Sequence, residues 1–76
     1  MSLKHGILGF LRYGEMTGYD LSKAFEASID NFWHASTSQI YRELRMLEED
    51  HLVESERIQQ TEKPNKKLYH ITPLPV

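Results

Sequence analysis

The stretch FWHASTSQIYRELRMLEEDHLV, residues 32–53, has the pattern of one amphipathic helix that runs into the start of a strand. Ser36 and Gln39 form the S-x-x-Q version of a capping box, in which each side chain accepts a backbone N–H at the start of the helix. Apolar side chains recur at i, i+4 and i+7, at Ile40, Leu44 and Leu47. These positions share one helical face. The stretch therefore predicts a helix over 36–50 that buries this face.

Two shorter helices are predicted upstream of this one. The apolar residues of segment 3–13 are spaced near the helical period, and Gly14 follows as a stop signal. Thr17, with Asp20 three positions later, approximates a second capping box for a helix over 18–29. The apolar stripe of that helix is Leu21, Ala24, Phe25 and Ile29. The aromatic pair Phe32 and Trp33 is expected in the core, where it would anchor the entry to the third helix.

Beyond His51 the pattern becomes that of a hairpin. Segment 54–60 has few helix signals, TEKPNK at 61–66 supplies turn residues, and KLYHIT at 67–72 is typical of a second strand. A two-stranded ribbon is not stable alone, so it must contact the helices. The contact would come from Leu68, Tyr69 or Ile71. The predicted fold class is mainly α with a small β-hairpin: a winged helix-turn-helix, three helices followed by a two-stranded wing.

Length and composition limit the possible classes of protein. The 76 residues, 39% of them apolar, suffice for a single domain over 1–76. Cysteine is absent, which excludes a disulfide framework and a thiolate metal site. No apolar run approaches the roughly 20 residues of a membrane span, and the N-terminal stretch lacks the pattern of a signal peptide. We expect a cytoplasmic protein with no membrane contact.

Neither catalysis nor metal binding has support in the sequence. The four histidines are scattered singly, without a paired spacing such as H-x-x-x-H. No Gly-rich phosphate loop occurs, and no nucleophile stands near a plausible base. A domain of this size also has little room for an active-site pocket. We therefore expect no enzyme activity, no metal and no cofactor.

The charges are unevenly distributed along the chain. The net charge is −2, which by itself argues against a nucleic-acid partner. Acidic residues dominate 43–56, whereas Arg57 and the lysines of 63–67 make the following segment basic. A local basic surface is thus compatible with the overall negative charge. Two hypotheses remain open: a DNA-binding domain, or a protein-interaction module that docks through the acidic 43–56 surface.

The outward face of the third helix carries the candidate DNA contacts. They are Thr37, Ser38, Gln39, Tyr41, Arg42 and Arg45. A helix fits the major groove, where arginine pairs with guanine or binds phosphate and glutamine can read adenine. The alternative is an ordinary solvated face, on which Arg45 and Glu49 would form an i,i+4 ion pair.

Further candidates lie in the wing, over 57–70, and in the second helix. Lys63, Lys66 and Lys67 surround the predicted turn and could contact phosphates beside the recognition helix. The alternative is a polar turn that protects the edge of the ribbon from aggregation. Tyr19 has a hydroxyl that could reach a phosphate, although packing in the core is an equally consistent role.

At this point the chain resembles a known family. LKHGILGFLRYGEMTGYDLSKAF at 3–25, the helix-three stretch and KKLYHIT at 66–72 look like the N-terminal domain of the PadR family of bacterial transcriptional regulators. The most specific pieces are GYDL at 18–21, S-x-x-Q-I-Y-R-E-L at 36–44 and LEEDHLV at 47–53. The start of the helix-three stretch is similar to the branch with virulence-gene activators and phenolic-acid-responsive repressors.

The resemblance implies a winged-helix domain that binds double-stranded DNA at a palindromic operator, as part of a homodimer. Helix 36–50 would enter the major groove, and the wing would approach the backbone. Two departures stand out: His51 replaces the glycine that is usual in the family, and the C-terminal helices for dimerisation and effector binding are absent. We therefore expect the chain to be a piece of a longer protein.

Overall fold

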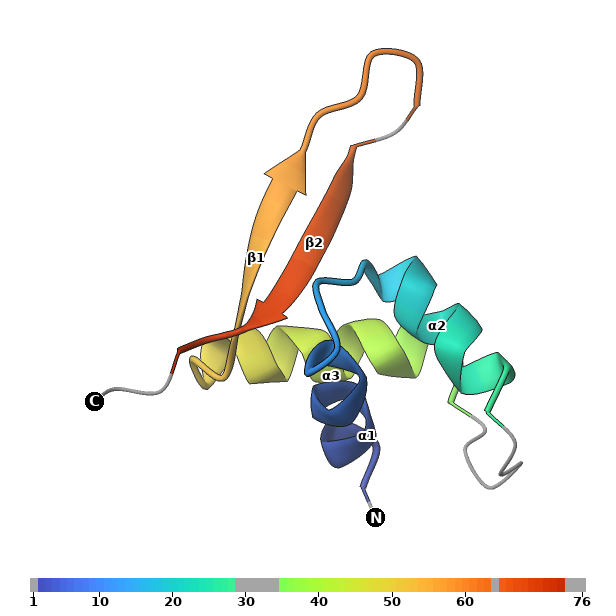
Figure 1. Ribbon diagram of the computed structural model, residues 1–76, viewed down its shortest axis with the longest axis vertical. Coiled ribbons are helices and arrows are strands. Elements are labelled where there is room, and N and C mark those ends of the chain that lie inside the picture. The colour runs from blue at the N-terminus through green and yellow to red at the C-terminus, as the bar shows by residue number, and fades with distance from the viewer. Residues whose placement is uncertain (1, 29–34, 64, 74–76) are drawn as a thin grey trace.

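The structure, a computed structural model, describes residues 2–28, 35–63 and 65–73. In these residues three helices precede an antiparallel hairpin (Figure 1). The elements are α1 (Leu3–Leu11), α2 (Gly18–Glu26), α3 (Thr37–Glu49), β1 (Val53–Ile58) and β2 (Lys66–Ile71). The predicted winged helix-turn-helix is confirmed, with α3 running across the molecule and the hairpin projecting away from the helices (Figure 1).

All three helices begin at a side-chain cap. Ser36 accepts the backbone N–H of Gln39 at 3.2 Å, and the Gln39 side chain accepts that of Ser36 at 2.9 Å. Thr17 and Asp20 make the same reciprocal pair at 2.9 and 3.1 Å. Both predicted capping boxes are therefore confirmed. Ser2 caps α1 by accepting the N–H of His5 at 3.4 Å.

Two helices end earlier than predicted. α1 ends at Leu11 rather than near residue 13, and α2 ends at Glu26 rather than at Ile29. In both cases the chain leaves the helix through tight i→i+3 bonds, Tyr13 N–H to Phe10 at 3.1 Å and Ser28 N–H to Phe25 at 3.3 Å. The predicted apolar role of Ile29 lies outside the described residues, as do the core positions predicted for Phe32 and Trp33.

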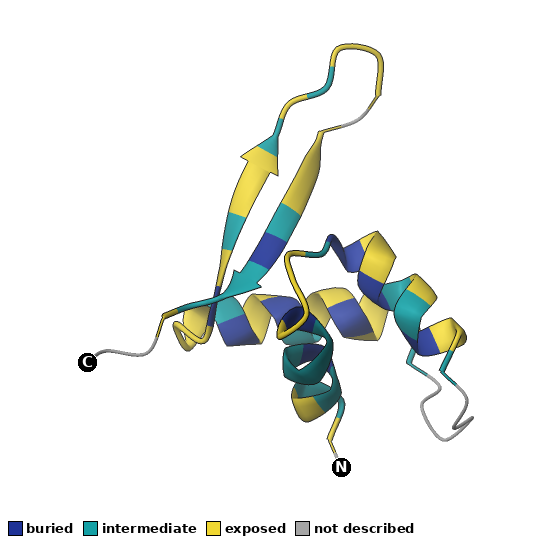
Figure 2. Ribbon diagram, viewed as in Figure 1, coloured by how far each residue is buried: buried dark blue, intermediate teal, exposed yellow. Residues whose placement is uncertain are grey.

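The core is a single cluster that joins every element (Figure 2). The three predicted residues of α3, Ile40, Leu44 and Leu47, are all buried, at 0–1% exposure. The other members come from the remaining elements and are Ile7, Leu11, Leu21, Phe25, Val53 and Tyr69. The rings of Phe10 and Phe25 meet edge to face at 5.0 Å and close the contact between α1 and α2.

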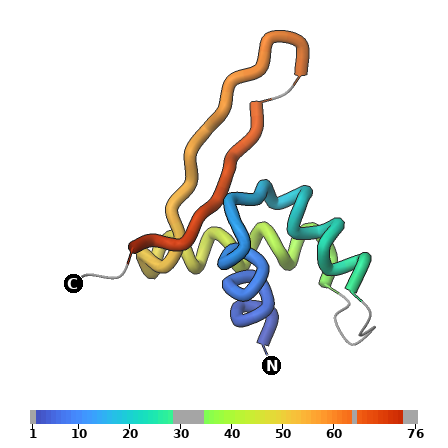
Figure 3. Tube along the Cα trace, in the orientation of Figure 1, coloured from blue at the N-terminus to red at the C-terminus, as the bar shows by residue number. Residues whose placement is uncertain are grey.

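Tyr69 anchors the wing to the helices. Of the three predicted candidates it alone is buried, whereas Leu68 and Ile71 are half-buried. The register pairs Tyr69 with Ser55, and its backbone also bonds Met16, with N···O distances of 2.8 and 3.1 Å. This bridge, which the sequence does not predict, ties the α1–α2 connection to β2 (Figure 3).

α3 ends in a Schellman motif. The N–H of Leu52 bonds the carbonyl of Leu47 at 2.9 Å, and the N–H of His51 bonds that of Glu48 at 3.1 Å. His51 has φ 61°, the left-handed conformation that favours glycine. A histidine in this conformation carries backbone strain that glycine avoids, and the hydrogen bonds of the motif hold it in place.

We predict that His51→Gly stabilises the domain by about 0.5–1 kcal/mol, because glycine adopts this conformation without a steric penalty. Urea unfolding of the two proteins measures the difference. Asp50→Gly is the matched control, since Asp50 has φ −83° and gains nothing from glycine. A loss of stability in His51→Gly would mean that the histidine side chain stabilises the turn.

Candidate nucleic-acid interface

The outward face of α3 is open to solvent along its length. Every predicted contact on it is exposed: Thr37, Ser38, Gln39, Tyr41, Arg42 and Arg45. Within the described part of the chain, neither Arg42 nor Arg45 has an ion-pair partner, so the alternative pair with Glu49 does not form. Both guanidinium groups therefore keep their donors available to an external acceptor.

Two of the candidates already make hydrogen bonds within the domain. The Thr37 hydroxyl lies 3.2 Å from that of Ser22, which links the start of α3 to α2. The side-chain oxygen of Gln39 accepts the Ser36 N–H in the capping box. A glutamine needs both its oxygen and its amino group to read adenine in bidentate fashion. While the cap is intact, the Gln39 oxygen already accepts one hydrogen bond from Ser36, and a bidentate contact with adenine would have to use its second lone pair.

Tyr41 packs against the first residue of α2. Gly18 is buried, and a Cβ placed on it would overlap the ring of Tyr41. Glycine at this position thus lets α2 and α3 approach closely, with Tyr41 still 44% exposed on the outer surface. The sequence shows the GYDL motif but not this contact, because the two residues are 23 positions apart.

A groove of about 420 Å³ brings α2, α3 and the wing together. Its lining includes Tyr19 from α2, Tyr41 from α3, and Lys66 and Lys67 from β2. Tyr19 is 62% exposed, so the alternative that placed it in the core is wrong. Four of the predicted DNA contacts thus converge on one surface, although sequence reasoning assigned them to three separate elements.

The lysines of the wing differ in their surroundings. Lys63 and Lys66 are exposed and have no ion-pair partner among the residues described. Lys67 Nζ lies 3.9 Å from a carboxylate oxygen of Glu48 and 5.6 Å from the centre of the Tyr69 ring. Burial raises the pKa of the Tyr69 hydroxyl above its usual value, and the nearby Glu48 and Tyr41 raise this pKa further. The positive charge of Arg45 lowers it in part.

The acidic residues of 43–56 do not form one free surface. Glu48 accepts a hydrogen bond from the Ser55 hydroxyl at 2.7 Å, and Glu54 lies 3.1 Å from the imidazole of His70. Alternation along β1 directs Ser55 to the α3 side of the hairpin, and Glu54 and Glu56 to the other side. This division disfavours the hypothesis of a docking surface that spans 43–56.

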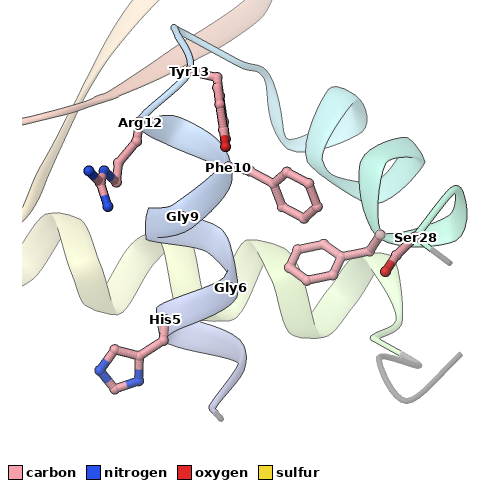
Figure 4. Close-up of a pocket in the computed structure, with 8 residues that line it drawn as sticks. His5, Gly6, Gly9, Phe10, Arg12, Tyr13 and Ser28 are labelled. Atoms are coloured by element: carbon pink, nitrogen blue, oxygen red, sulfur yellow. The ribbon is translucent and has the colours of Figure 1, made fainter. Parts of the chain in front are cut away.

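A second hollow, of about 520 Å³, lies beside α1 and contains none of the predicted site residues (Figure 4). Its lining includes Phe10, Tyr13, Arg12 and His5 from the α1 region and Phe25 from α2. In the described ranges no group of three acidic or histidine side chains is placed to hold a metal. Among the described residues, no helix has the length and apolar character needed to cross a bilayer.

Residues 7–74 match the profile of the transcriptional regulator PadR-like family. The chain belongs to this family. Membership in a family of transcriptional regulators agrees with the prediction of a domain without enzyme activity. It also confirms the resemblance inferred from the GYDL and S-x-x-Q-I-Y-R-E-L motifs at residues 18–21 and 36–44.

Among the PadR-like proteins, the negative transcriptional regulator PadR of Bacillus subtilis is 41% identical over 70 residues, which are 92% of this chain. The chain spans only 38% of the length of that relative. The structure of B. subtilis PadR in complex with operator DNA superposes with a TM-score of 0.84, over 92% of this chain and 40% of that chain. A PadR-like regulator from Bacillus cereus is 33% identical, with a TM-score of 0.72, over 91% of this chain and 38% of that one.

We predict that Gly18→Ala destabilises the domain by about 1–3 kcal/mol, because the new methyl group displaces the Tyr41 ring. Gly9→Ala in α1 is the matched control. A Cβ at Gly9 meets nothing within 4 Å, so alanine there should stabilise the helix by about 1 kcal/mol. Urea unfolding of both variants tests the contact, and equal effects of the two substitutions would contradict it.

Proposed function

We propose that this chain is the sequence-specific DNA-binding domain of a bacterial PadR-like transcriptional regulator. The observation that supports this most strongly is the convergence of Tyr19, Tyr41 and Lys66 on one groove. Next to Tyr41 on α3 are Arg42 and Arg45, which have no ion-pair partner among the described residues. The likeness to B. subtilis PadR in complex with operator DNA supports the same function.

In this proposal α3 enters the major groove. An α-helix fits the width of that groove, and exposed arginines can pair with guanine O6 and N7 or with phosphates. Arg42 lies opposite the buried stripe of α3, so it reaches furthest from the domain. Thr37 and Ser38 stand in the first turn, where hydroxyl groups and the positive end of the helix dipole favour phosphate.

The wing would contact the DNA backbone next to α3. Lys63 in the loop and Lys66 at the start of β2 are free to neutralise phosphates, which sets affinity and salt dependence rather than sequence preference. The hydroxyls of Tyr19 and Tyr41 border the same groove as Lys66 and could donate to the phosphates between them. Lys67 is a weaker candidate, since Glu48 already pairs with it.

The full-length protein would act as a cytoplasmic homodimer on a palindromic operator. Two recognition helices must be held at a fixed separation to read half-sites one helical turn apart. A single copy of the present domain loses the effective concentration that a dimer supplies. We expect the 76-residue chain to bind DNA weakly, and nanomolar binding by this chain alone would contradict that expectation.

Arg42→Ala should weaken DNA binding by about 1–3 kcal/mol, which is roughly 5- to 150-fold, and leave the fold intact because the side chain is exposed. An amide NMR titration with a short duplex at low salt measures both properties. Arg12→Ala removes the same charge from the hollow beside α1 and serves as the control. If both variants bind as tightly as the unmodified chain, α3 does not face the DNA.

Lys66→Gln should lower the steepness of log K against log salt concentration by about 0.9, the value for one lost phosphate contact. Titrations at several salt concentrations give the two slopes. Lys4→Gln on α1 is the control and should leave the slope unchanged. If Lys66→Gln and the unmodified chain have the same slope, Lys66 does not contact a phosphate.

A further inference from the structure

A single carboxylate near the end of α3 contacts both strands of the wing. Glu48 Oε2 accepts the hydroxyl of Ser55 in β1 at 2.7 Å. Its other oxygen, Oε1, lies 3.9 Å from the ammonium group of Lys67 in β2. Because each oxygen meets a different strand, the side chain connects the helix to the hairpin at two points.

The two contacts differ in strength. The Ser55 bond is short, partly buried and assisted by the carboxylate charge, and such bonds are among the stronger ones in proteins. The Lys67 side chain is 44% exposed and that of Glu48 38%, so solvent screens much of their attraction. The Tyr69 ring, whose centre is 5.6 Å from Lys67 Nζ, adds a second favourable interaction for the same ammonium group.

Apart from Glu48, the wing is held by the buried side chains of Val53 and Tyr69 and by the backbone bridge between Met16 and Tyr69. Its buried residues, Val53 and Tyr69, lie near the base, while the rest of both strands is exposed or half-buried (Figure 2). A ribbon of two strands is only marginally stable by itself. A small rotation at the base therefore moves the projecting loop a long way relative to α3 (Figure 1).

We propose that Glu48 is a positioning residue for DNA binding, which sets the angle between the wing and the recognition helix. In this role Lys67 is part of the brace and is not a phosphate contact, whereas Lys63 and Lys66 remain free for the backbone. The inference rests on the proposed function, because the angle matters only if α3 and the wing engage the same duplex.

Whether DNA affinity rises or falls when Glu48 is replaced distinguishes a positioning role from simple charge repulsion. Removing a negative charge close to DNA strengthens binding when the charge acts only through repulsion. Removing a brace weakens binding, because the wing must then be ordered when the complex forms. Glu48→Ala should therefore lower affinity about three- to tenfold. Glu49→Ala, the exposed neighbour, should leave affinity unchanged or raise it.

The experiment is a titration of the 76-residue chain and its variants with a short mixed-sequence duplex at low salt, with folding checked by amide spectra. Glu48→Gln keeps an oxygen for Ser55 and should recover most of the affinity lost in Glu48→Ala. Ser55→Ala changes no charge and should weaken binding about two- to threefold. It tests the brace even if Glu48→Ala fails to fold.

Lys67 provides an independent measurement. When Glu48 is intact, Lys67→Gln should leave the salt dependence of DNA binding unchanged. Lys66→Gln should lower the steepness of that dependence by about 0.9. An equal decrease in Lys67→Gln would show that Lys67 leaves Glu48 for a phosphate, and would overturn its role in the brace. A folded Glu48→Ala that binds as tightly as the unmodified chain, or more tightly, would overturn the positioning role.

Failure of the Glu48 positioning role can be distinguished from failure of DNA binding itself. If the unmodified chain does not respond to the duplex at low salt, the DNA-binding proposal fails, and the inference fails with it. If the unmodified chain binds and Arg42→Ala weakens binding, the function stands. The response of Glu48→Ala and Ser55→Ala then decides the inference alone.

Discussion

The buried stripe of α3 is the constraint on which the other features depend. Ile40, Leu44 and Leu47 are almost completely excluded from solvent and contact the residues of α1, α2 and the hairpin in one cluster. A helix of 13 residues that buries one face must present the opposite face to solvent. The exposure of Arg42 and Arg45 therefore follows from the same packing that holds the domain together.

The surface around α3 depends on two close contacts. Gly18 allows Tyr41 to lie against the start of α2, and the Met16 bridge brings Tyr69 and β2 to the same region. Without the first, a side chain at position 18 would overlap the Tyr41 ring and force α2 and α3 apart. Without the second, β2 would lose its backbone link to the α1–α2 connection and would depend on its side-chain contacts with the helices. Together they place aromatic hydroxyls and wing lysines along one groove.

The negative net charge does not conflict with a DNA-binding role, because several carboxylates are engaged inside the domain. Asp20 completes a helix cap, Glu48 contacts the wing and Glu54 faces His70. The cations proposed for DNA, Arg42, Arg45 and Lys66, have no such partners within the described residues. Local pairing, rather than the sum of charges, determines which groups remain available to a ligand.

The sequence by itself predicted the order of elements, both capping boxes and the buried residues of α3. It also predicted that Arg42 and Arg45 are exposed. These signals lie within three to seven neighbouring residues. Helix ends were less predictable, since i→i+3 bonds shortened α1 and α2. Only the tertiary structure decided that Tyr69 is the wing anchor, that the Gln39 oxygen is held in its cap, and that Glu48 contacts both strands. It also brought Tyr19, Tyr41 and Lys66 to one groove. These outcomes depend on hairpin register and on approach between distant segments, which no local pattern of residues encodes.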